Sequence, residues 1–363
     1  MKMTKHLPVY NIPLDMAPYE PIVMHPLFTR LSRIQQVPLA EHLYPGCKHT
    51  REEHSLGSFY LAGRIADVLG LSTEDGEAVK IGALVHDIGH GPFSHITDYL
   101  LKRIGKDHNQ KTVEIVKELR DSIQGLGNVD PDKVVEIVSK NHELSPIVSS
   151  IIGADKLDYV GLDLYHCDER KVSTRGLIEL LKFRGSNGSR EYGVSYSNGG
   201  EDALTNFLSE WWSAYKTIYF EPSVEIRREM FKRAVHYTIS PERLIELFDM
   251  DDGQLMTRVN ESGDEDARRL IENVNGYKLH QPVAVFKREG HKLYTDVGDS
   301  RAITITEDEI ESLPSRIDDL LRKEEGLCEE FDVPKGSIIL SQCEELQRLN
   351  PDKKRCNIFL DGS

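Results

Sequence analysis

The sequence of 363 residues predicts a mainly α-helical protein with a smaller C-terminal region that mixes helices and strands. Two observations carry this prediction. Between residues 27 and 237, apolar residues recur every three or four positions, which is the period of amphipathic helices. After about residue 275 the pattern changes to short runs such as KLHQPVAVFKRE and GSIIL, which are typical of strands. We therefore expect a helical body at 1–275 and an α+β region at 276–363.

The predicted elements follow in order along the chain. Residues 1–25 carry four spaced prolines, which forbid a long helix there. Ser72 and Asp75 resemble a capping box, and the Gly-, Ser- and Asn-rich stretch 184–200 predicts a loop or hairpin with a short strand at YGVSY. Helices are expected at 27–37, 54–71, 74–88, 96–104, 109–119, 131–140, 145–152, 153–168, 202–219, 223–237, 307–325 and 342–349, and further strands at 278–289, 292–298, 302–306 and 336–340.

Composition narrows the functional classes. The net charge of −15 disfavours broad binding to nucleic acid, because an acidic surface repels phosphate backbones. The N-terminus shows no apolar signal region, and no run of about 18 apolar residues exists, so we expect a cytoplasmic protein without a membrane span. The five cysteines are scattered and form no CxxC pair. Reduced thiols are therefore expected rather than a disulfide framework.

The stretch ALVHDIGHGPFSH, residues 83–95, gathers side chains that bind metals. His86 and Asp87 offer an imidazole nitrogen and a carboxylate oxygen, a donor set that suits Fe, Mn, Zn or Mg rather than copper. Two ligands are too few for a stable site. His54 and Asp155, from distant segments, are the candidates that would complete it.

Three segments together resemble a known family. TREEHSLG, GALVHDIGHGPFSH and ADKLDYVGLD occur in order and resemble the HD-domain phosphohydrolase superfamily, in its deoxynucleoside triphosphate triphosphohydrolase (dGTPase-like) branch. The resemblance covers about residues 27–240. It implies an HD-domain helical bundle, a nucleotide substrate and assembly into dimers or tetramers. It also implies that a divalent metal (Mg, Mn, Fe or Zn) is held by His54, His86, Asp87 and Asp155.

The same resemblance assigns residues around the phosphates and the sugar. His90, His95, Asp98 and His108 match positions beside the phosphates. We expect Asp98 to pair with His108, because a carboxylate fixes the tautomer of an imidazole, and His95 to protonate the leaving 5′-oxygen. The positions that match substrate contacts are Gln36, Val37, Arg51, Lys156, Tyr159, Asp163 and Tyr219, with Tyr215 beside the base.

The sequence also departs from the family. NIPLDMAPYE lacks the DPVHG-like signature, Trp211 stands where some relatives carry a phosphate-binding arginine, and Glu221 replaces a histidine. We expect metal-dependent hydrolysis of deoxynucleoside triphosphates to deoxynucleoside and inorganic triphosphate. The alternatives are an HD-type phosphatase or phosphodiesterase acting on other nucleotides, and a nucleotide-binding regulatory module with little turnover.

Overall fold

The computed structural model describes residues 3–184, 191–195, 199–285, 287–289, 292–294, 317–330, 335, 338–342 and 356–360. The chain forms two compact units. The first comprises Met1–Glu221 and Ile245–Leu255, and the second comprises Pro222–Leu244 and Met256–Ser363. The sequence-based division into 1–275 and 276–363 stays a prediction.

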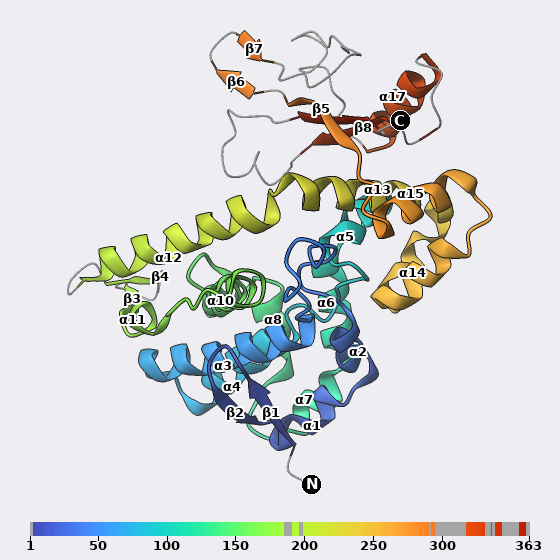
Figure 1. Ribbon diagram of the computed structural model, residues 1–363. Coiled ribbons are helices and arrows are strands. Elements are labelled where there is room, and N and C mark those ends of the chain that lie inside the picture. Colours follow the sequence, from blue (N-terminus) through green and yellow to red (C-terminus); the bar gives the residue numbers. More distant parts are fainter. Residues whose placement is uncertain are drawn as a thin grey trace. The chain divides into compact units, whose positions relative to one another are not determined.

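Three long helices form the centre of the first unit (Figure 1). Helix α3 (Arg51–Leu69) packs against both α4 (Thr73–Val85) and α10 (Ala154–Asp168). The predicted cap at the start of α4 is confirmed, because the Ser72 hydroxyl accepts a hydrogen bond from the backbone N–H of Asp75 at 3.1 Å. The start of α3, the end of α4 and the start of α10 carry the conspicuous polar residues of the sequence.

Shorter elements surround these helices. Strands β1 (Thr4–Leu7) and β2 (Ile12–Asp15) form an antiparallel hairpin near the N-terminus. Between α4 and α10 lies a series of short helices. They are α5 (His95–Leu101), α6 (His108–Glu118), α7 (Arg120–Gln124), α8 (Pro131–Val138) and α9 (Ser145–Ser149).

The expected helix at 27–37 is shorter than predicted. Helix α1 (Glu20–Val23) and helix α2 (Pro26–Thr29) precede a single 3₁₀ segment at Arg30–Arg33. Ile34 is extended, and Gln35 pairs with Thr50 as an isolated antiparallel bridge. This pairing ends the helix, since the chain must straighten to meet the segment that leads into α3.

The rest of the first unit follows α10. Helix α11 (Arg175–Ile178) leads into strand β3 (Leu181–Arg184), which pairs antiparallel with β4 (Glu191–Val194). The hairpin expected from the glycine-rich stretch is therefore confirmed in its described part. Helix α12 (Gly200–Ala214) follows and continues as a π-helical turn at Tyr215–Tyr219.

The second unit contains helices and small sheets. Helix α13 (Pro222–Thr238) packs on α15 (Glu265–Asn275), and Arg233 of α13 makes a buried double hydrogen bond to Glu324 of α17 (Ile317–Glu330). A 3₁₀ segment at Pro241–Asp249 and helix α14 (Asp252–Asn260) fall across the division between the units. The strands are β5 (Gln281–Val285), β6 (Lys287–Glu289), β7 (Lys292–Tyr294), β8 (Ile338–Gln342) and β9 (Cys356–Leu360).

The described strands of this unit form two antiparallel sheets. β9 lies between β5 and β8, and β6 pairs with β7. The mainly helical fold with a few small sheets towards the C-terminus is thus confirmed. The strand expected at 302–306 and the helix expected at 342–349 lie outside the described residues, except that β8 includes 342.

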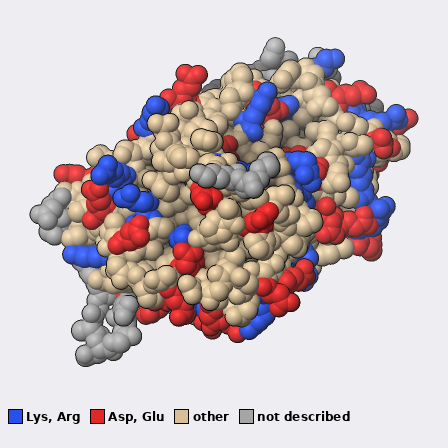
Figure 2. Space-filling model, turned by 90° about the horizontal axis from the view of Figure 1, so that it is seen from below, with Lys and Arg blue, Asp and Glu red and all other residues tan. Residues whose placement is uncertain are grey.

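Figure 2 shows acidic and basic side chains interspersed on the face in view. Within the described parts of the chain, no helix is both long and apolar enough to cross a membrane.

Candidate metal centre

Four side chains from three separate segments meet in the first unit. His54 Nε2 lies 3.2 Å from His86 Nε2 and 3.3 Å from the Oδ1 atom of Asp155. His86 Nε2 lies 3.5 Å from the same Asp155 oxygen and 3.4 Å from Asp87 Oδ1. Ligands about 2.1 Å from one metal ion are roughly 3–3.5 Å apart. The ligand atoms of His54, His86 and Asp87 lie within 4.8 Å of one another, which fits a single cation, and Asp155 adjoins both imidazoles. All four residues were expected from the sequence.

Both imidazoles are held by their other ring nitrogen. The Nδ1 atom of His86 lies 2.7 Å from the carbonyl oxygen of Ala83, so it donates its proton there. The Nδ1 atom of His54 lies 2.7 Å from Asp158 Oδ2 and donates to that carboxylate. Each bond selects the tautomer that carries a lone pair on Nε2, which is the arrangement of metal-binding histidines. Both Nε2 atoms face the meeting point.

Asp158 is a site residue that the sequence analysis missed. It is fully buried, and its other carboxylate oxygen accepts a hydrogen bond from the Tyr10 hydroxyl at 2.6 Å. Gly57 makes room for it, since a Cβ atom there would lie 1.9 Å from Asp158 Oδ1. The available signal was the spacing of three residues from Asp155, which places both carboxylates on one side of α10.

Arg51 flanks the candidate metal centre. Its guanidinium donates to Asp87 through Nη1 and to the Ser94 hydroxyl through Nε at 2.8 Å. Ser94 in turn donates to the carbonyl oxygen of Gln35 at 2.7 Å. Arg51 is buried and engaged with Asp87. Its expected contact with phosphate stays a prediction.

The electrostatics of the four groups favour added positive charge. Burial lowers the pKa of His54, but its hydrogen bonds to Asp155 and Asp158 outweigh burial and raise that pKa to about 10. Burial likewise opposes charge on His86, and the attraction of Asp87 raises its pKa. Burial raises the pKa values of Asp87 and Asp155, yet the neighbouring histidines hold both below their ordinary range. These pKa shifts mean that the two carboxylates attract positive charge to the site. Protons on the two imidazoles supply it without a metal, and a divalent cation would replace them.

A second cluster of histidines adjoins the first. The rings of His90 and His108 stack with centroids 3.8 Å apart, and His95 meets both rings edge-on. The expected pairing of Asp98 with His108 is confirmed, because Asp98 accepts from both the Nδ1 atom and the backbone N–H of His108. Hydrogen bonds to His108 and His95 outweigh burial and lower the pKa of Asp98.

The members of this second cluster differ in exposure. The His95 side chain is 64% exposed, whereas His90 is buried and its Nδ1 atom has no hydrogen-bond partner among the described residues. Burial, aided by the charge of Arg51, lowers the pKa of His90 well below its ordinary value. Neutral, buried His90 thus lies beside the exposed ring of His95.

The loop that carries these histidines is fixed by two residues that the sequence did not indicate. Buried Arg30 donates to the carbonyl oxygens of Ile88, His90 and Met250 at 2.7–3.3 Å. Asp252 accepts from the backbone N–H groups of Phe93 and Gln35 at 2.6 and 2.9 Å. Burial raises the pKa of Asp252 to about 6.

Phe93 and Ser94 have left-handed backbone angles, both with φ of 54°. Such angles cost energy for residues other than glycine. The bonds of Arg30 and Asp252 therefore hold the loop in a conformation that its sequence alone would not prefer.

Aromatic residues line the neighbouring part of the first unit. The Tyr159 hydroxyl accepts from Trp211 Nε1 at 2.8 Å and from Lys156 Nζ at 3.0 Å. The Lys156 ammonium group also lies over the Trp211 ring, 5.4 Å from its centroid. Tyr159 and Tyr219 meet edge-on at 6.4 Å. The predicted substrate contacts Lys156, Tyr159 and Tyr219 are thus close to one another, together with Trp211.

The remaining predicted contacts fall into two places. Buried Asp163 accepts hydrogen bonds from the Tyr219 hydroxyl and from His49 Nε2, the latter at 2.7 Å. Val37 is buried, and the buried Oε1 atom of Gln36 has no hydrogen-bond partner among the described residues. An acceptor of this kind is available to a ligand hydroxyl.

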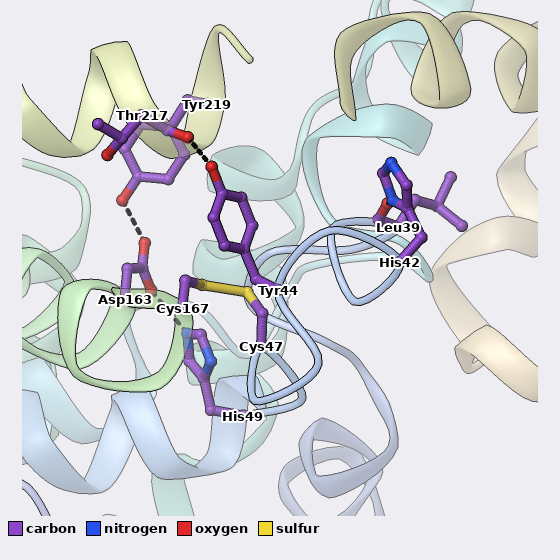
Figure 3. Close-up of a disulfide and its surroundings, with 9 residues drawn as sticks. All are labelled: Leu39, His42, Tyr44, Cys47, His49, Asp163, Cys167, Thr217 and Tyr219. Carbon is purple, nitrogen blue, oxygen red and sulfur yellow. Dashed lines mark hydrogen bonds and ion pairs between the residues drawn. A yellow bond between two sulfur atoms is a disulfide. The ribbon is translucent and has the colours of Figure 1, made fainter. Parts of the chain in front are cut away.

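The expectation of reduced thiols is wrong for two cysteines. Cys47 and Cys167, 120 residues apart, are joined by a disulfide (Figure 3). No local spacing could have indicated it, because the fold alone brings the end of α10 to the segment before α3. Cys328 is a free buried thiol.

Comparisons with known proteins identify a match to one domain family. Residues 51–168 match the model of the HD domain. The chain is 29% identical over 267 residues to the uncharacterized protein MJ1154 of Methanocaldococcus jannaschii, covering 71% of this chain and 54% of that protein. It is 44% identical over 84 residues to the deoxynucleoside triphosphate triphosphohydrolase SAMHD1 of Homo sapiens, covering 21% of this chain and 13% of that protein.

A homolog of that triphosphohydrolase in Dictyostelium discoideum is 27% identical over 179 residues, covering 43% of this chain and 35% of that protein. The matches span about half the length of the archaeal relative and less of the other two. The matched residues of the HD domain include all four that converge at the metal centre.

Proposed function

We propose that this chain, an HD-domain protein similar to deoxynucleoside triphosphate triphosphohydrolases, hydrolyses deoxynucleoside triphosphates to deoxynucleoside and inorganic triphosphate. The observation that carries the proposal is the convergence of His54, His86, Asp87 and Asp155. The Nε2 atoms of the two histidines lie 3.2–3.7 Å from each other and from carboxylate oxygens of the two aspartates. These residues would hold a divalent cation. When bound, such a cation supplies Lewis acidity, which makes water a better nucleophile and neutralises phosphate charge.

The chain's own residues supply the remaining chemistry. Asp98 holds His108 through Nδ1, so the other ring nitrogen of His108 remains for a phosphate oxygen. His95 is exposed and adjoins His90 and His108, which suits a group that delivers a proton to the leaving 5′-oxygen. Neutral His90 offers a hydrogen bond without adding a charge that would repel the metal.

Other side chains of the first unit would bind the nucleoside part of the substrate. Tyr159 and Tyr219 offer aromatic surface, and Gln36 Oε1 can accept a hydrogen bond from a sugar hydroxyl. Val37 is the residue that would crowd the 2′ carbon. A ribose hydroxyl buried there without a partner would cost about 1–3 kcal/mol.

A second candidate is hydrolysis of other phosphorylated nucleotides. Trp211 occupies the position at which some relatives carry a phosphate-binding arginine, and Lys156 contacts Tyr159 and lies over Trp211. Fewer cations near the phosphates would favour a substrate with fewer phosphates.

Product analysis tests both candidates. The purified protein is incubated with each deoxynucleoside triphosphate and with Mg²⁺, Mn²⁺, Fe²⁺ or Zn²⁺, and phosphorus NMR identifies the inorganic product. We expect triphosphate and free deoxynucleoside, and no reaction after chelation of the metal. Release of orthophosphate or pyrophosphate without triphosphate would exclude the triphosphohydrolase reaction and support the second candidate. No turnover with any nucleotide would support a regulatory module.

A further inference from the structure

A second group of metal-binding residues lies at the other end of α10. Cys47 and His49 precede α3, and Cys167 is the penultimate residue of α10. One ring nitrogen of His49 and the two sulfur atoms lie within 4.8 Å of one another, and all three residues are buried. Figure 3 shows the His49 ring beside the disulfide. None of these side chains belongs to the metal centre described above.

The hydrogen bonds of His49 leave one nitrogen available. His49 Nε2 lies 2.7 Å from Asp163 Oδ1 and donates its proton to that carboxylate, whose other oxygen accepts from Tyr219. Nδ1 then carries a lone pair. It is buried and has no hydrogen-bond partner among the described residues, although a buried polar atom without a partner is costly. A carboxylate on one nitrogen and an open lone pair on the other is how proteins prepare a histidine for metal.

We propose that Cys47, Cys167 and His49 Nδ1 form a second metal site, which takes a thiophilic divalent cation such as Zn²⁺ when the disulfide is reduced. Two thiolates and one imidazole are ligands that favour zinc over magnesium or manganese. Three protein ligands leave a fourth position for solvent or a small anion. Since Asp163 contacts both His49 and Tyr219, the site also adjoins a predicted substrate contact.

The change between the two states balances in atoms and electrons. A dithiol or phosphine reductant supplies two electrons to the disulfide and is itself oxidised. The S–S bond breaks and two protons from solvent complete the thiols of Cys47 and Cys167. On metal binding both thiols release these protons, and each sulfur donates an electron pair to the cation.

Metal binding would require only a small separation of the two sulfur atoms. Zinc–sulfur bonds of 2.3 Å in tetrahedral geometry place two sulfurs about 3.8 Å apart, farther than in a disulfide. The Cα atoms of Cys47 and Cys167 lie 4.6 Å apart, so rotation about the Cα–Cβ bonds can separate the sulfurs. His49 need not move, because Asp163 already holds its ring.

Cobalt spectroscopy tests the site in the full-length protein. Co²⁺ replaces Zn²⁺ and gives a near-ultraviolet sulfur-to-cobalt charge-transfer band only with thiolate ligands, so the oxygen- and nitrogen-rich centre at His54 does not contribute. We expect phosphine-reduced protein to develop the band, saturating at one equivalent per chain, and Zn²⁺ to abolish it. Oxidised protein should show no band.

Variants assign the ligands. The double substitution Cys47→Ser and Cys167→Ser should remove the band, and Cys328→Ser, at a buried thiol in the other unit, should leave it unchanged. His49→Ala should weaken cobalt affinity at least tenfold. Absence of the band in reduced wild-type protein, or its persistence in the double variant, would overturn the proposal. The comparison of reduced with oxidised wild-type protein needs no variant, so a folding defect cannot hide the answer.

Discussion

Helix α10 orients one histidine near each of its ends, and the two are held in opposite senses. Asp158 binds His54 through Nδ1 and leaves Nε2 open, whereas Asp163 binds His49 through Nε2 and leaves Nδ1 without a partner. Both carboxylates are buried. A buried carboxylate thus orients a histidine at two places in the fold. The ring nitrogen that binds the carboxylate determines which nitrogen stays open.

The neighbouring donors distinguish the two ends. His54 faces His86 and two carboxylates, which suit a hard or borderline cation, whereas His49 faces two sulfur atoms. A carboxylate on one ring nitrogen therefore prepares the other nitrogen of the histidine as a ligand, and the neighbouring donors decide which metal it suits. The following predictions test that distinction, beginning with the largest expected effect.

His86→Ala should abolish metal binding at the first end and reduce triphosphate release about 1000-fold, because Lewis acidity contributes several kcal/mol to such hydrolysis. Elemental analysis and the product assay measure both effects. The exposed His6 of β1 provides a matched control, and His6→Ala should match wild type. Full activity of the His86 variant would remove the metal centre from the proposed function.

The double substitution Cys47→Ser and Cys167→Ser should destabilise the oxidised, metal-free protein by about 3 kcal/mol, because the disulfide closes a long loop in the unfolded chain. Urea unfolding measures the change in free energy. Under reducing conditions without zinc, variant and wild type should differ little. An equal difference in both conditions would assign the effect to packing rather than to the covalent link.

The carboxylate of Asp252 should make stability pH-dependent near the first end. Its pKa in the folded protein is about 6, above its ordinary value, because it is buried. A raised carboxyl pKa means that stability is fully present below about pH 4 and declines as the pH rises through 6.

Between these limits the decline should amount to about 2 kcal/mol, and Asp252→Asn should flatten it. Unfolding curves from pH 4 to 7 measure the slope. Parallel slopes in variant and wild type would show that Asp252 titrates like a solvent-exposed carboxyl group.

Asp158→Asn should lower metal affinity at the first end about tenfold, because the amide no longer attracts charge onto His54. Asp163→Asn, five residues along α10, is the matched change at the other end and should leave that affinity unchanged. Calorimetric titration of oxidised protein with Mn²⁺ compares them. Similar losses in both variants would mean that the carboxylates act through helix stability instead.

Much of the first end could be predicted because its residues stand in dense local patterns. His86 and Asp87 are adjacent, His90 and His95 follow within one loop, and helical periodicity placed Asp155 near the start of α10. A metal and a phosphate need several donors at fixed spacing, and adjacent residues in one segment can supply part of such a set. Asp158, Arg30 and Asp252 were missed, since each acts through a partner far away in the chain.

By itself, the sequence determined the helical class, the capping of α4 and the identity of the donor-rich segments, because these depend on neighbours a few positions apart. Only the tertiary structure decided that Cys47 meets Cys167 and that Tyr10 reaches Asp158. It also decided which ring nitrogen of His54 and of His49 is held by a carboxylate and which is left for a ligand. These facts depend on the packing of α10 against α3, which joins residues more than 100 positions apart and leaves no local trace in the sequence.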